Sequence, residues 1–169
     1  PGPRMPEQNG QRPGTQVAQR LFVELKEPLE VGCDLIAGSL IKNPGGALAP
    51  RGGYVAGRED LVELASIRLS APGIAGEVGS ALDFNRLAYQ GLFMAPLIVE
   101  QALKGAVYAS CLLEKMGYDV SPRYDEERAD IIQAIKLGSA DKIRAYCRGI
   151  QKASPLDAYV TPYDTPLPG

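Results

Sequence analysis

Apolar and polar positions in the first third of the chain predict two short strands separated by a loop. Residues 1–15 are rich in proline and glycine and almost free of apolar positions, so we expect a disordered or irregular arm. Residues 33–41 form a short apolar run typical of a buried strand, and residues 54–56 form a second one. Residues 43–53, between them, are rich in glycine and proline and predict a loop.

Two helices are predicted after these strands. Glu59 and Asp60 predict the first turn of a helix, since carboxylates near a helix N-terminus complement the helix dipole. Residues 92–116 carry the longest helical pattern, in which Glu100 and Lys104 share a narrow polar stripe at i,i+4 spacing. So wide an apolar surface predicts burial of this helix on more than one side.

In the last third of the chain, alternation of apolar and polar positions predicts strands. Residues 118–120 and 131–137 alternate like strands, and Ser139 is a predicted N-cap for a final helix. The order of elements predicts an α/β fold. The first two strands are too few to form a stable sheet alone, so we expect flanking strands to be missing.

Composition narrows the classes of function. The net charge of -2 provides no basic field for nucleic acid or an anionic membrane. There is no histidine, which excludes Ser-His-Asp catalysis and histidine-ligated zinc, and we expect no metal site. Three widely spaced cysteines fit reduced, buried thiols. With no signal peptide and no uninterrupted apolar span, a cytoplasmic protein is expected.

The candidate chemistry lies where the first strand ends. Lys42 follows an apolar run, and a buried lysine tends to lose its proton and become a nucleophile that condenses with aldehydes. Ser39, three residues earlier, and the free backbone N–H groups of the glycine-rich loop at Asn43, Gly45 and Gly46 can hold a phosphate. An aldehyde and a phosphate together describe pyridoxal phosphate.

The same spacing has two other interpretations. Lys42 can be a surface lysine that extends its amine into water, and spacing alone favours that interpretation. Ser-x-x-Lys is also the acylation motif of penicillin-binding serine enzymes, which would make Ser39 the nucleophile of an acyl-enzyme hydrolase. The Ser-Asp-Asn and Lys-Thr-Gly partners of that motif do not occur in this sequence.

A family resemblance covers nearly the whole chain from Phe22. It is carried, in order, by residues 30–46, 52–57, 71–79, 84–86, 89–91, 130–136, 149–155 and 159–162. Over these segments the sequence resembles the pyridoxal-phosphate family of aluminium-resistance proteins, also described as methionine gamma-lyase or cystathionine beta-lyase-like.

The resemblance implies a carbon–sulfur lyase of fold type I, the aspartate-aminotransferase architecture. Lys42 would form the internal aldimine and move the Cα proton, Ser39 would bind the phosphate, and a sulfur amino acid would undergo β- or γ-elimination. A homodimer, or a tetramer of dimers, is also implied. The implied division is a disordered or non-family arm at 1–20, part of the large domain at 21–117 and the start of a small C-terminal domain at 118–169.

The chain departs from the family pattern before Phe22. Residues 16–21 do not match the family's Asp-Asn-Cys-Tyr-Gly-Glu strand end. Family members are more than twice as long, and their cofactor-binding aspartate lies upstream of the lysine. We therefore expect weak cofactor binding and little turnover by this chain alone. The alternative is a catalytically inactive remnant that acts as an oligomerisation or interaction module through residues 92–116.

Overall fold

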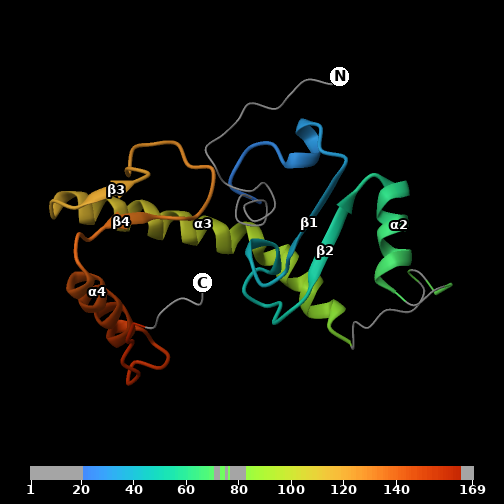
Figure 1. Ribbon diagram of the computed structural model, residues 1–169. Helices are drawn as coiled ribbons and strands as arrows, with labels where there is room; N and C mark the ends of the chain where they lie inside the picture. Colours follow the sequence, from blue (N-terminus) through green and yellow to red (C-terminus); the bar gives the residue numbers. More distant parts are fainter. Residues whose placement is uncertain (1–20, 71–72, 75, 77–82, 165–169) are drawn as a thin grey trace.

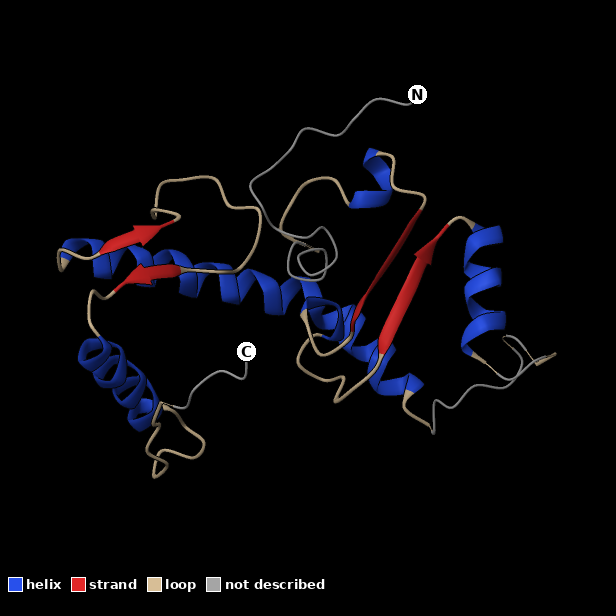
Figure 2. Ribbon diagram, viewed as in Figure 1, coloured by secondary structure: helices blue, strands red, loops and turns tan. Residues whose placement is uncertain are grey.

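The computed structural model describes residues 21–70, 73, 74, 76 and 83–164 (Figure 1). The arm predicted at residues 1–20 lies outside the described residues. The described part mixes helices and strands, as the α/β prediction requires. Figure 2 shows two strand pairs set toward opposite ends of one long helix.

The first strand pair confirms the two strands predicted early in the chain. β1 (Leu35–Ser39) pairs antiparallel with β2 (Gly53–Gly57), so that Leu35 faces Gly57 and Ser39 faces Gly53. A short 3-10 turn, η1 (Pro28–Val31), precedes β1. A second one, η2 (Asn43–Gly45), lies in the loop between the strands.

Helix α2 (Glu59–Leu69) begins where the two acidic residues predicted it. Arg58, at its N-cap, ties it to the start of β1 through a 3.2 Å contact with Asp34 and bonds Asp60 at 2.7 Å. These ion pairs are exposed, so each contributes little to stability.

Helix α3 (Asn85–Lys115) is the long central helix of the molecule. It begins at residue 85 rather than at residue 92. The predicted start was wrong because Gly91 and the polar residues before it interrupt the apolar pattern. Gly91 is in fact buried in the contact between α3 and the η2 loop. The buried residues of α3 all lie along one side: Gly91, Ala95, Val99, Ala106, Ser110 and Leu113.

Burial on more than one side of α3 was also predicted, and for the described residues this is wrong. The opposite side carries Phe93 at 84% exposure and Tyr108 at 71% exposure. β1 likewise is not the buried strand that was expected, since Leu35 is 39% exposed. The physical reason is the same in both cases, because the described elements supply no second layer over these apolar surfaces.

A second strand pair lies beside the C-terminal half of α3, which it contacts through β3. β3 (Asp119–Ser121) and β4 (Ala134–Lys136) pair antiparallel, with Val120 opposite Ile135. β3 contacts α3, and Ser110 in α3 donates a 2.9 Å hydrogen bond to the Pro122 carbonyl. These contacts confirm both predicted strands, although each is shorter than or shifted from its predicted range.

Helix α4 (Ala140–Ala153) confirms the predicted N-cap, because the Ser139 hydroxyl accepts a hydrogen bond from the Lys142 amide. Its apolar residues are exposed. Among these is Cys147, and Cys33 is also exposed, so the prediction of buried cysteines is wrong for both. Cys111, in α3, is half-buried.

By length and composition, α3 alone among the described helices is apolar enough to cross a membrane. Two observations favour a helix that packs within a protein. The η2 loop covers part of its N-terminal half, and an ion pair between Glu100 and Lys104, with 2.6 Å between their charged atoms, lies at its middle.

Candidate functional site

Lys42 lies at the N-cap of η2, just after β1. Its amide donates to the Ser39 carbonyl at 3.3 Å, and its carbonyl accepts from the Gly45 amide at 3.0 Å. The backbone of Lys42 is therefore fixed at the end of the strand. Its side chain, however, is exposed. The described residues therefore do not bury the Lys42 side chain, in agreement with the surface interpretation that spacing alone favoured.

Ser39 ends β1 and faces the same turn. Its hydroxyl oxygen accepts a hydrogen bond from the Ile41 amide at 3.3 Å. Because the oxygen accepts that bond, the hydroxyl proton is left to donate to another group. Ser39 and Lys42 are thus held within one turn, with a hydroxyl and an amine available at the end of a strand.

Several backbone amides of the glycine-rich loop form hydrogen bonds within the loop itself. The Gly46 amide donates to the Asn43 carbonyl at 3.0 Å, and the Leu48 amide donates to the Gly45 carbonyl at 2.9 Å. These amides, like that of Gly45, satisfy the turn itself. The Asn43 side chain is buried and donates to the Leu21 carbonyl at 3.1 Å.

The loop glycines instead allow the loop to lie directly on α3. A Cβ at Gly46 would collide with the Gly91 carbonyl, and a Cβ at Gly91 would collide with the Gly45 carbonyl. Gly46 also has a positive φ of 51°, which disfavours side chains. Gly45 and Gly46 therefore position the Lys42 turn by backbone-to-backbone packing.

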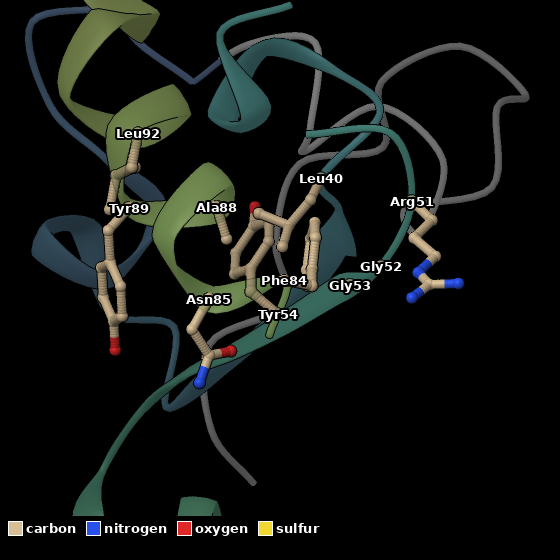
Figure 3. Close-up of a pocket in the computed structure, with 10 residues that line it drawn as sticks. All are labelled: Leu40, Arg51, Gly52, Gly53, Tyr54, Phe84, Asn85, Ala88, Tyr89 and Leu92. Carbon is tan, nitrogen blue, oxygen red and sulfur yellow. The ribbon is translucent and has the colours of Figure 1, made fainter. Parts of the chain in front are cut away.

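A separate cleft of about 570 Å³ lies between the start of β2 and the start of α3 (Figure 3). In the figure, the rings of Tyr54 and Phe84 lie near its centre, between Tyr89 on one side and Arg51 on the other. Lys42 and Ser39 do not line this cleft. The full lining set is Leu40, Arg51, Gly52, Gly53, Tyr54, Phe84, Asn85, Ala88, Tyr89 and Leu92.

Tyr54 is the unusual residue of the cleft. Its hydroxyl is buried and has no hydrogen-bond partner among the described residues. It lies against Gly38 on the paired strand, where a Cβ would come within 2.6 Å of the hydroxyl oxygen. Burial raises the pKa of the Tyr54 phenol, and the Glu27 carboxylate raises it further.

Tyr54, Arg51 and Phe84 were not among the residues for which the sequence predicts a chemical role. Their signal was present in Arg51-Gly52-Gly53-Tyr54, where a cation and an aromatic flank two glycines. In the structure, the ring of Phe84 lies over Gly52, within 3.0 Å of where a Cβ would stand. Small residues there make room for aromatic side chains from two distant segments.

The sequence profile of the methionine gamma-lyase family matches residues 19–169. The chain belongs to this family. It is 49% identical over 148 residues to uncharacterized protein YnbB of Bacillus subtilis, a match that covers 88% of this chain and 35% of YnbB. It is 46% identical to an uncharacterized 33.9 kDa protein of Lactobacillus delbrueckii, covering 88% of this chain and 48% of that protein.

Solved structures of related proteins share the backbone arrangement. A carbon–sulfur lyase involved in aluminium resistance from Clostridium novyi is 53% identical with a TM-score of 0.80, over 86% of this chain and 35% of that one. A protein of Listeria monocytogenes, provisionally named a cystathionine beta-lyase involved in aluminium resistance, is 46% identical with a TM-score of 0.85, over 89% of this chain and 37% of that one. The chain therefore spans about a third of the length of these structures.

Proposed function

We propose that this chain carries the cofactor lysine of a pyridoxal-phosphate-dependent carbon–sulfur lyase, and that this lysine is Lys42. The observation that carries the proposal is the placement of Lys42 and Ser39 within one turn at the end of β1, in a family whose members are named as lyases. The fold expected of the whole protein is fold type I, with this chain supplying the end of the large domain and the start of the small one.

The donor set of this turn fits the two reactive ends of the cofactor. An aldehyde needs a primary amine, which Lys42 provides, and a phosphate needs hydrogen-bond donors, of which the Ser39 hydroxyl is one. The Gly45 and Gly46 amides fit less well, because they already bond within the turn. We assign Asn43, Gly45 and Gly46 the role of fixing the turn against α3.

Each residue then has a defined task in the reaction. When bound, pyridoxal phosphate supplies an electron sink for the carbanion formed at the Cα of an amino acid. Lys42 would hold the cofactor through its amine, and the same amine would serve as the base that takes the Cα proton of the substrate. The substrate class is a small sulfur-containing amino acid such as methionine or cystathionine, and the setting is the cytoplasm.

Because the Lys42 side chain is exposed, we expect its amine to be a weaker nucleophile in this chain than in the whole protein. A nucleophilic lysine is usually desolvated or placed beside another cation. In the whole protein, the walls that desolvate Lys42 would come from the two thirds of the family fold that this chain does not span. We therefore expect cofactor binding to exceed turnover in this chain.

A cofactor titration tests the proposal. Adding pyridoxal phosphate to the purified chain is expected to produce a bound, red-shifted absorbance that is lost in Lys42→Arg, which keeps the charge but does not condense. Lys26→Arg is the matched control, because Lys26 is also exposed but lies before η1. Ammonia release from methionine or cystathionine is expected to be at or near background.

Two outcomes would contradict the proposal in different ways. Equal absorbance changes in Lys42→Arg and Lys26→Arg would show that surface lysines bind the aldehyde without selectivity. No change at all would favour the inactive remnant that acts as an interaction module.

A further inference from the structure

Asn43, the residue that follows Lys42, is a buried polar side chain. It is 8% exposed, and its side-chain amide donates a 3.1 Å hydrogen bond to the carbonyl of Leu21, which lies 22 residues earlier in the chain. Leu21 is itself buried, at 7% exposure. Burying an amide is costly unless it is hydrogen-bonded, and here the bond closes a loop that runs from residue 21 through η1 and β1 to the Lys42 turn.

The backbone that presents the Leu21 carbonyl is held in a strained conformation. Phe22 has a positive φ of 67°, which is uncommon for a residue that has a Cβ. Its amide donates a 3.0 Å hydrogen bond to the Glu27 carboxylate, and the Glu27 amide donates to the Glu30 carboxylate at 2.8 Å. Strain of this kind persists only where the surrounding structure fixes it, and it is concentrated at functional sites. We call residues 21–27 the clasp.

The Lys42 turn is therefore attached at two places. Gly45 and Gly46 pack against the backbone of α3, and Asn43 bonds the clasp. Because the Lys42 side chain is exposed, the position of its amine relative to the Ser39 hydroxyl depends on the backbone of the turn. An attachment that fixes this backbone also fixes the spacing of the two groups.

We infer that Asn43 is a positioning residue for Lys42, through which the clasp holds the Lys42 amine and the Ser39 hydroxyl at the spacing that one molecule of pyridoxal phosphate needs. The inference rests on the proposed function, in which Lys42 takes the aldehyde and Ser39 the phosphate. One molecule can make both contacts only while the turn is held, because preorganised groups bind as a unit. Glu27 acts one step further away, by fixing Phe22.

Hydrogen exchange tests the attachment without any cofactor. Asn43→Asp keeps the size of the side chain but replaces its N–H donor by an acceptor, which cannot bond the Leu21 carbonyl. Protection of the Gly45 and Gly46 amides should fall about tenfold, as expected when a buried hydrogen bond is lost, while the amides of α4 keep theirs. Asn85→Asp is the matched control, because it makes the same change at the exposed first residue of α3, where a carboxylate complements the helix dipole.

A comparison of pyridoxal phosphate with pyridoxal tests the effect on Lys42. Brief exposure to either aldehyde, borohydride reduction and peptide mass spectrometry give the labelled fraction of each lysine. Dividing the value for Lys42 by that for Lys26, which is also exposed, corrects for the different reactivities of the two aldehydes. In the wild type, the phosphate should raise this ratio about tenfold, because Ser39 binds it. In Asn43→Asp, the ratio should be the same for both aldehydes.

Glu27 provides a second pair of variants, which tests the clasp even where Asn43→Asp fails to fold. Glu27→Ala removes the acceptor of the Phe22 amide and should lower both the protection and the phosphate preference. Glu27→Gln keeps a side-chain oxygen that can accept the same bond and should preserve both. A purely electrostatic role of Glu27 would instead make the two variants equivalent, which would contradict the clasp.

The outcomes separate this inference from the proposed function. A wild-type chain without phosphate preference at Lys42 would overturn both. A wild-type chain that has the preference, together with a folded Asn43→Asp variant that keeps it, would overturn the inference and leave the proposed function intact. Unchanged protection of Gly45 and Gly46 in Asn43→Asp would show that the bond to Leu21 does not hold the turn, and would likewise overturn the inference alone.

Discussion

At the scale of single residues, Lys42 lies just after β1, as expected, and its exposed side chain agrees with the surface interpretation that spacing alone favoured. The apolar run before it was a sound signal for β1. Burial, however, depends on what covers a strand, and residues 33–41 contain no information about the covering layer. A short sequence can therefore place a reactive group along the chain while leaving its protonation environment undetermined.

Tyr54 supplies a prediction about stability. Tyr54→Phe is expected to raise the free energy of unfolding by about 1 kcal/mol, because it removes a buried hydroxyl that has no partner. Urea unfolding at neutral pH measures this change. A loss of stability in the variant would show that the hydroxyl makes a favourable interaction.

The same residue predicts a dependence on alkaline pH. Burial and Glu27 raise the pKa of Tyr54, so the folded state favours the neutral phenol. Its contribution to stability is present below the ordinary pKa of 10.0 and is lost as the pH rises through the folded value. The advantage of Tyr54→Phe over the wild type should therefore grow between pH 9 and pH 11.

At the scale of elements, the contact between the η2 loop and α3 should be intolerant of any side chain. Gly91→Ala is expected to lower the free energy of unfolding by about 3 kcal/mol or more, because its Cβ meets the backbone of Gly45. Gly149→Ala in α4 is the matched control, since nothing lies within 4 Å of its Cβ position. That variant should gain about 0.5–1 kcal/mol from helix propensity. Thermal or urea unfolding of both variants decides the point, and equal effects would contradict the packing role.

A two-point ion pair joins α4 to the C-terminal segment. Arg144 bonds the two carboxylate oxygens of Asp164 at 2.8 and 3.0 Å, and these bonds lower the pKa of Asp164 to about 2. The attachment is present above the ordinary pKa of 3.8 and is lost as the pH falls through about 2.

An NMR titration of the Asp164 carboxyl group measures this attachment directly. In the wild type the midpoint should lie near 2, and in Arg144→Gln it should return toward 3.8. A wild-type midpoint already near 3.8 would mean that the segment does not dock on α4 in solution.

The elements that could be predicted are those specified by local chemistry. Ser139 predicted the start of α4 because an N-cap side chain bonds an amide in the first turn of its own helix. Glu59 and Asp60 predicted the start of α2 because carboxylates in the first turn act on the dipole of their own helix. The start of α3 was predicted incorrectly because Gly91 is a helix breaker locally. Gly91 instead allows α3 to pack closely against the η2 loop, which lies more than forty residues away in sequence.

At the scale of the whole molecule, α3 organises two strand pairs that do not contact one another extensively (Figure 1). The turn that carries Lys42 packs on the N-terminal half of α3, and β3 packs on its C-terminal half. The sequence predicted these pieces and their order. It did not predict the Tyr54 cleft, because that cleft forms only when Phe84 and β2 meet across the fold.

The central claim concerns which amine of this chain holds pyridoxal phosphate. Borohydride reduction of the chain with bound cofactor makes the link permanent, and peptide mass spectrometry then identifies the modified lysine. The account predicts that the label is on Lys42 and that Lys42→Arg loses it while the other lysines stay unmodified. Labelling spread over several exposed lysines, or concentrated on a lysine other than Lys42, would contradict it.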